Sequence, residues 1–296
     1  MIVSSPSENI RCVLDIKASL GECPTWSIAE RVLYWVDINA PSLNRFDPAT
    51  GQNTVMPMPE SIGCFALRRS GGFVVALRGG IWLAQPDGTL MRKVATAPYD
   101  PTHHRFNDGR CDPQGRLLVG TMNEKRDAST AALYRLDADF TLTRILSDMT
   151  ISNGLGFSPD GRTMYHSDTP LQLITAHDYD GATGTPSKTR DFARFTDPGD
   201  RPDGAAVDSE GCYWSAQYRG GKIKRIAPDG RLLAEYPVPS MCPTMCAFGG
   251  PDLNTLYVTT ARQQREADEL ARLPFSGGLF SMRVDVAGLP EPSFAG

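Results

Sequence analysis

Six short apolar segments recur along the chain, and each begins at a turn and is rich in branched and aromatic residues, as β-strands are. They are RVLYWVDI (31–38), GGFVVALR (71–78), GRLLVGTM (115–122), GRTMYHSD (161–168), GCYWSAQY (211–218) and NTLYVTTA (254–261). Their starts lie about 40–50 residues apart, a period typical of propellers and other arrays of repeated units. Strands alternating with Gly-rich turns predict an all-β fold. Six repeats then predict a six-bladed β-propeller that takes up residues 1–296 as a single domain.

The two ends of the chain carry weaker patterns. Residues 1–12 indicate either a short tail or a strand that closes the ring. The segment QREADELARLP (264–274) is the one plausible helix, and we expect it to be a surface insertion in the last repeat rather than part of a site.

Composition narrows the class of protein. An apolar content of 41% supports a packed core, and a net charge of −4 without a basic face argues against nucleic acid as a partner. No uninterrupted apolar run approaches the roughly 18 residues that span a bilayer, so no membrane partner is expected. The first residues show no signal-peptide pattern, and the seven irregularly spaced cysteines indicate free thiols. We therefore expect a cytoplasmic protein.

Four oxygen-bearing side chains occupy one position of the repeat. Asn107, Asn153 and Asp203 stand at the same interval before the turn glycines that open the third, fourth and fifth segments. Glu22 stands one residue further ahead of the first segment. In a propeller this position is the start of an inner strand beside the central channel, so the four side chains are expected to converge there.

The other two repeats offer no ligand at this position, because they have Gly63 and Pro243 there. Four polar residues against two without a ligand group predict one site on one side of the channel rather than a general feature of the repeat.

The converging groups have the chemistry of a metal site. Glu22, Asn153 and Asp203 supply two carboxylates and one amide carbonyl, without thiolate or imidazole. This set suits Ca²⁺, Mg²⁺ or Mn²⁺ first, with Zn²⁺ and Fe²⁺ as further candidates, so we expect one divalent ion. Three protein ligands leave positions for water and substrate, as at a catalytic ion. Asp203 is also the candidate general base, and Asn107 would ligate through water or orient a substrate oxygen.

Two cations and two histidines lie near these residues in the sequence. Arg105 and Lys125 could hold hydroxyls or a carboxylate of a substrate, or could be ordinary surface charges. His103 and His104 are adjacent, so on an extended strand they point to opposite faces and cannot share an ion. Together the parts describe hydrolysis of an activated ester at a metal site. A serine esterase is disfavoured, because the sequence has no GxSxG motif.

At these residues the chain resembles the senescence marker protein/gluconolactonase/regucalcin family, from about Leu14 to Val284. The motifs that carry the resemblance are LGECPTW, RFNDGRCDPQGRLLVGTM, SNGLGFSPDGRTMYHSD, RPDGAAVDSEG and FGGPDLNTLYVTTAR, in this order and spacing. The resemblance implies a six-bladed propeller with one divalent ion in its central channel. It also implies hydrolysis of sugar lactones to aldonic acids.

The resemblance also implies roles for particular residues. It places the family's metal-binding glutamate on Glu22, its asparagine ligand on Asn153, and its aspartate ligand and general base on Asp203. It places the substrate-facing asparagine on Asn107 and the substrate-contacting arginine on Arg105.

Two positions depart from the family pattern and keep alternatives open. Cys23 stands where many members have glycine, and Lys125 stands where some animal members have a glutamate that touches substrate. A cation at position 125 would favour an aldarolactone, which carries a second carboxylate, over a neutral aldonolactone. The remaining alternatives are a phosphotriester or aryl-ester hydrolase and a non-catalytic calcium-binding propeller. Because four repeats carry a polar residue at this channel position and two do not, an enzyme is favoured over a scaffold.

Overall fold

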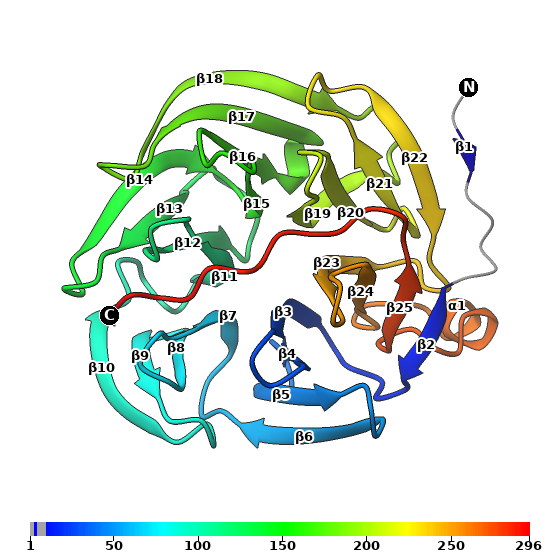
Figure 1. The fold of residues 1–296 in the computed structure, drawn as a ribbon, viewed down its shortest axis with the longest axis horizontal. Coiled ribbons are helices and arrows are strands. Elements are labelled where there is room, and N and C mark those ends of the chain that lie inside the picture. Colours follow the sequence, from blue (N-terminus) through cyan, green and yellow to red (C-terminus); the bar gives the residue numbers. More distant parts are fainter. Residues whose placement is uncertain (1–2, 5–9) are drawn as a thin grey trace.

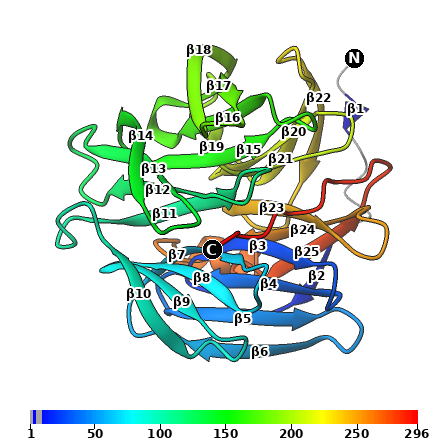
Figure 2. The same cartoon turned by 60° about the vertical axis from the view of Figure 1, so that its left-hand side comes forward.

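The computed structural model describes residues 3–4 and 10–296, which form a ring of six sheets around a central axis (Figure 1). In every blade the strands step outward from the axis in sequence order, except that N-terminal strands are added at the outer edges of two blades (Figures 1 and 2). The predicted all-β, six-bladed β-propeller is confirmed.

The strands of the first three blades follow one another without crossovers. Blade 1 has β3 (Gly21–Ser27), β4 (Val32–Asp37), β5 (Ser42–Asp47) and β6 (Gln52–Pro57). Blade 2 has β7 (Ile62–Leu67), β8 (Phe73–Leu77), β9 (Gly80–Ala84) and β10 (Leu90–Thr96). Blade 3 has β11 (His104–Cys111), β12 (Leu117–Asn123), β13 (Ala131–Leu136) and β14 (Leu142–Met149).

The other three blades repeat this plan, with additions from the N-terminal segment. Blade 4 has β15 (Ser152–Phe157), β16 (Thr163–Asp168), β17 (Leu173–Asp180) and β18 (Thr185–Arg194), with a short 3₁₀ turn η2 (Thr169–Leu171). Blade 5 has β19 (Arg201–Val207), β20 (Tyr213–Tyr218), β21 (Lys222–Ile226) and β22 (Leu232–Pro237), and β1 (Val3–Ser4) pairs with β22. Blade 6 has β23 (Pro243–Gly249), β24 (Thr255–Thr260) and β25 (Leu279–Arg283), with β2 (Arg11–Leu14) as its outer strand.

The ring is closed by pairing β2 with β25, so the two ends of the propeller meet in blade 6. The N-terminal prediction was therefore right for β2, whereas residues 1–2 and 5–9 lie outside the described residues. The expected helix is α1 (Ala267–Arg272), which buries no side chain and is a surface insertion between β24 and β25. Within the described part of the chain, no helix is both long and apolar enough to cross a membrane.

The six recurring segments form the second strand of each blade, and the inner strand ahead of each is almost wholly buried. Neighbouring blades are joined by aromatic contacts. Trp26 of blade 1 stacks on Tyr257 of blade 6 with ring centroids 5.8 Å apart, and Trp214 of blade 5 meets the ring of Phe248 of blade 6 edge-on at 5.5 Å. Such pairs add to the hydrophobic burial that fixes the angle between blades.

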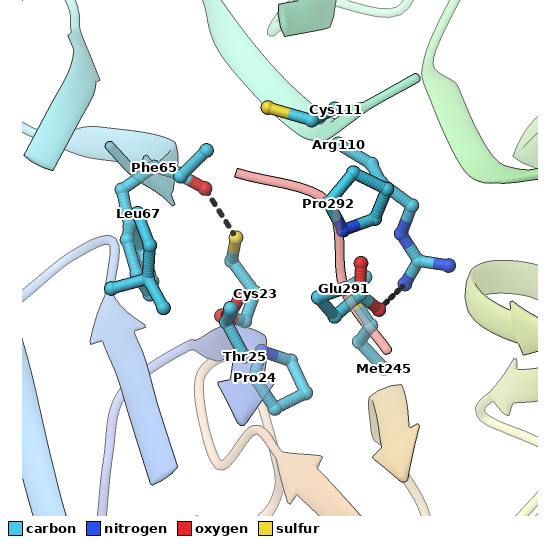
Figure 3. Close-up of a pocket in the computed structure, with 12 residues that line it drawn as sticks. Cys23, Pro24, Thr25, Phe65, Leu67, Arg110, Cys111, Met245, Glu291 and Pro292 are labelled. Atoms are coloured by element: carbon cyan, nitrogen blue, oxygen red, sulfur yellow. Dashed lines mark hydrogen bonds and ion pairs between the residues drawn. The ribbon is translucent and has the colours of Figure 1, made fainter. Parts of the chain in front are cut away.

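The C-terminal segment crosses one face of the ring over the channel (Figure 1). Phe294 is fully buried, and its backbone pairs with Leu67 and Arg69 of blade 2. Figure 3 shows Glu291 turned toward Arg110, whose guanidinium lies 3.3 Å from the carboxylate. This contact neutralises a buried arginine of β11 and ties the segment to the channel wall.

His166 and His177 are buried in blade 4. The imidazole Nε2 of His166 lies 2.8 Å from the Ser152 hydroxyl. The pKa of His166 is lowered to about 3, mainly by burial and to a smaller extent by the nearby His177. The folded protein therefore holds this ring neutral, whereas the unfolded chain protonates it near pH 6.5.

We expect His166→Gln to make the protein less sensitive to acid. Because the folded-state pKa of His166 is depressed, its contribution to stability is present above pH 6.5 and is lost as the pH falls toward about 3. In that window the parent should lose about 1.4 kcal/mol more per pH unit than a variant without this proton. Urea unfolding of both proteins at pH 7, 5.5 and 4.5 measures the difference. Parallel losses in parent and variant would contradict the assignment.

Candidate active site

A cavity of about 230 Å³ lies where the inner strands of blades 1, 3, 4 and 5 begin. Five of the six predicted site residues line it, and all five are buried. They are Glu22, Arg105, Asn107, Asn153 and Asp203. The convergence expected from the repeat position is thus present in the fold.

Each of these inner strands starts with a β-bulge, and the residue that lines the cavity stands at the bulge or directly before it. On β3, Glu22 pairs with Val36 and Thr25 pairs with Tyr34, so two residues of β3 oppose one of β4. The same irregularity follows Phe106 on β11, Asn153 on β15 and Pro202 on β19. Bulges of this kind re-aim side chains at the ends of strands.

The loops that lead into two of these strands are held in the same way. Asp37, at the end of β4, accepts hydrogen bonds at 2.8 and 3.0 Å from two backbone amides just ahead of β3. Asp168, at the end of β16, accepts two at 3.0 and 2.9 Å from amides just ahead of β15. These buried carboxylates fix the backbone from which Glu22 and Asn153 project.

The equivalent position of blade 2 cannot carry a side chain. A Cβ at Gly63 would collide with the backbone carbonyl of Phe106 on the neighbouring inner strand β11. Glycine is therefore required for close packing of β7 against β11, and blade 2 contributes no ligand to the site for this steric reason.

A chain of hydrogen bonds fixes the two asparagine amides. Arg105 has only donors, so the atom of Asn107 that lies 2.7 Å from its guanidinium is Oδ1. Nδ2 of Asn107 then donates to Oδ1 of Asn153 at 2.6 Å, and Nδ2 of Asn153 donates to the Thr169 hydroxyl at 2.7 Å. Thr169 in turn donates to the carbonyl of Pro202. One lone pair of Asn153 Oδ1 remains for a ligand.

The two acids of the cavity are held without a cationic partner. Burial raises the pKa of Glu22 well above its usual value, and the negative charges of Asp203 and Asp108 raise it further. Burial and Asp108 likewise raise the pKa of Asp203, whereas Arg105 and Arg126 act in the opposite direction. Neither acid forms an ion pair with any residue in the described ranges 3–4 and 10–296.

This arrangement fits a bound cation. Two buried carboxylates that repel each other destabilise the protein unless a positive charge compensates them. With the free lone pair of Asn153 Oδ1 they form the hard-oxygen set predicted from the sequence, and such a set suits a divalent ion. The resident ion itself remains a prediction.

The structure places Lys125 outside the cavity. Its ammonium lies on the exposed surface, 3.2 Å from Nε2 of His103, and the neighbouring Arg126 lines the cavity instead. The left-handed backbone of Arg126, with φ of 57°, turns the chain at this point. The substrate-binding role suggested for Lys125 therefore has no support from its position.

Sequence reasoning missed four residues that belong to the site. Arg126 and Arg201 line the cavity, Thr169 orients Asn153, and Asp108 adds a third buried negative charge beside Asn107. Asp108 accepts a hydrogen bond from the amide of Leu155 at 3.0 Å through one oxygen. Its place beside Asn107 was a usable signal, whereas nothing in the sequence distinguishes Arg126 from Lys125.

A second cluster of potential ligands, formed by Asp208, Glu210 and Cys212, has a structural role. Asp208 accepts hydrogen bonds from the backbone amides of Glu210 and Cys212, and from the indole of Trp214 at 2.9 Å. Both carboxylates also pair with Arg225, at 2.8 and 2.6 Å. Their charges are therefore already compensated within the turn.

Fold and site together define a six-bladed propeller with a cavity lined by buried carboxylate and amide oxygens. Residues 20–262 match the profile of the SMP-30/Gluconolactonase/LRE-like region, and the chain belongs to this family. A 6-deoxy-6-sulfogluconolactonase of Pseudomonas putida is 49% identical over 292 residues, which cover 98% of this chain and 100% of that protein. An L-arabinolactonase of Azospirillum brasilense is 38% identical, covering 98% and 97% of the two chains.

A solved structure supports the same assignment. The crystal structure of a calcium-binding protein, regucalcin from Agrobacterium tumefaciens, superposes with a TM-score of 0.92 at 31% identity and covers 96% of both chains. The family resemblance predicted from the motifs is confirmed, and so is the enzyme class, a lactonase. The alternative of a non-catalytic propeller is thereby disfavoured.

Proposed function

We propose that the protein hydrolyses a sugar lactone to the corresponding aldonic acid, with the help of one divalent ion. The observation that carries this proposal is the convergence of Glu22, Asn153 and Asp203 from equivalent bulges of three blades into one cavity. The names of two similar proteins, a sulfogluconolactonase and an arabinolactonase, support a sugar lactone as the substrate class.

Glu22, Asn153 and Asp203 would hold the ion, which when bound supplies a Lewis acid for the lactone carbonyl. The repulsion between the two buried carboxylates accounts for why this position selects a cation. Asn107 is one hydrogen bond away from Asn153 and is placed to orient a substrate oxygen.

Asp203 would act as the general base. It accepts a proton from the attacking water as the new C–O bond forms at the carbonyl carbon. The ring C–O bond then breaks, and the same proton can pass to the departing ring oxygen, so that the open-chain acid results. Arg105 would bind a substrate hydroxyl or carboxylate, because its guanidinium is fixed against Asn107 and faces the cavity.

The cysteines support a reducing environment for this reaction. All seven are free thiols, six of them are buried, and burial raises the pKa of Cys23 to about 12. Such thiols are poor nucleophiles and play no part in the proposed chemistry. A cytoplasmic location is part of the proposal.

We expect pentono- and hexonolactones to be opened only in the presence of a divalent ion. The measurement is acid release from a panel of lactones with Ca²⁺, Mg²⁺, Mn²⁺, Zn²⁺ or Fe²⁺ after treatment with chelator, with spontaneous opening subtracted. Phosphotriesters and aryl esters in the same panel test the remaining alternative. Hydrolysis of these esters without hydrolysis of lactones would overturn the proposed function.

A further inference from the structure

Positively charged side chains outnumber negatively charged ones around the cavity. Among its described lining residues three are arginines and two are acids, namely Arg105, Arg126, Arg201, Glu22 and Asp203. A divalent ion held by the two acids would cancel their charge and leave the arginines in excess. An excess of cations in a partly enclosed space favours an anionic ligand.

The arginines differ in how far they are already compensated. The Nε of Arg105 lies 3.7 Å from Glu124, so a carboxylate is already close to it. Arg126 and Arg201 form no ion pair with any residue that the structure describes. These two are also more exposed than the acids, so they lie toward the mouth of the cavity.

The acids next to these arginines in sequence are engaged elsewhere. Asp127 accepts a hydrogen bond from the side-chain Nδ2 of Asn123 at 2.9 Å. Asp200 is buried, contacts Lys224 and lies 3.2 Å from Lys222. The two guanidinium groups are therefore left without the neutralisation that their neighbours could have provided.

The loop that carries Arg126 is held in place by hydrogen bonds to Asn123. The Oδ1 of buried Asn123 accepts a hydrogen bond from the backbone amide of Lys125 at 3.0 Å. Its Nδ2 donates a hydrogen bond to the carbonyl of Ala128 at 3.0 Å. The amide of Arg126 donates to the Asn123 carbonyl at 3.1 Å. One buried side chain thus directs Lys125 to the surface and Arg126 to the cavity.

We propose that Arg126 and Arg201 form a subsite for a terminal oxyanion, so that the enzyme prefers sugar lactones that carry a carboxylate, sulfonate or phosphate at the end remote from the reacting carbonyl. The inference rests on the proposed function, because the acids fix where the carbonyl lies. Guanidinium groups bind such oxyanions through paired hydrogen bonds. Both arginines line the same cavity as Asp203, so the two ends of one small substrate can lie within it.

The test compares four lactones that share one hexonolactone ring and end in a hydroxymethyl, carboxylate, sulfonate or phosphate group. For the metal-loaded parent, kcat/KM should be at least about tenfold higher with one or more anionic lactones than with the neutral one. Arg126→Gln and Arg201→Gln should each lower this ratio by about tenfold to a hundredfold, mainly through KM, the range expected for a charge-assisted hydrogen bond. Added salt should also lower the parent's ratio.

Three further variants sharpen the test. Arg126→Lys should keep part of the preference. Arg144→Gln removes an exposed arginine from the outer strand β14 of the same blade and should keep all of it. A larger loss in Lys125→Gln than in Arg126→Gln would overturn the assignment of the subsite.

The two proposals fail in different ways. A parent ratio near one, or a ratio unchanged in both arginine variants, overturns the oxyanion subsite while lactone hydrolysis stands. If the parent opens none of the four lactones with any divalent ion, the proposed function fails and the subsite fails with it. The order of preference among the three anions identifies which terminal group the subsite takes.

Discussion

Asp203→Asn is expected to lower kcat for lactone opening by at least about 10²–10⁴-fold, the range over which general-base catalysis operates. The amide has nearly the same size as the carboxylate but cannot accept the proton of the attacking water. Asp203 is buried, and no cationic side chain of the described residues forms an ion pair with its carboxylate. The loss should be larger still if the ion also leaves.

The measurement is single-substrate turnover of the variant, with metal content determined by elemental analysis on the same sample. Arg105→Ala offers a comparison in the same cavity, because it removes a binding group and should raise KM more than it lowers kcat. If Asp203→Asn keeps its ion and opens lactones at the parent rate, another group must take the proton from water.

The fold and the centre of the site could be predicted because both follow from one repeated pattern. A repeat places equivalent residues at equivalent places in a ring, so the shared position of Glu22, Asn107, Asn153 and Asp203 already implied that they meet. The structure adds that each of these side chains stands at, or directly before, a β-bulge at the start of its inner strand.

The rest of the site depends on contacts that are not periodic. Whether Lys125 or Arg126 faces the cavity is decided by the hydrogen bonds of Asn123 within one loop, and both are cations in the same turn. Thr169 acts through a 3₁₀ turn that is present in blade 4 and breaks the repeat. Sequence periodicity therefore locates the proposed ion ligands, and loop geometry decides which further residues line the cavity.

Glu22→Gln is expected to change metal binding and stability in opposite directions. Replacing a carboxylate ligand with a neutral amide should weaken the affinity for the divalent ion by at least about 100-fold. Even changes to residues that only contact the ligands lower metal affinity by about 10–100-fold. Without an ion, however, the variant should be at least as stable as the parent. Burial and the charge of Asp203 oppose ionisation of Glu22, and the amide removes that repulsion.

Two measurements separate these effects. Titration calorimetry gives the affinity for the ion, and thermal unfolding is recorded with chelator and again with the ion in excess. The parent should gain Tm strongly on adding the ion, because a ligand that binds the folded state stabilises it, whereas Glu22→Gln should gain little. Glu266→Gln removes an exposed carboxylate beside α1 and should behave as the parent does. Equal ion affinity in Glu22→Gln and the parent would remove Glu22 from the ligand set, and a lower Tm of the variant in chelator would show that its carboxylate is not under the repulsion inferred from the cavity.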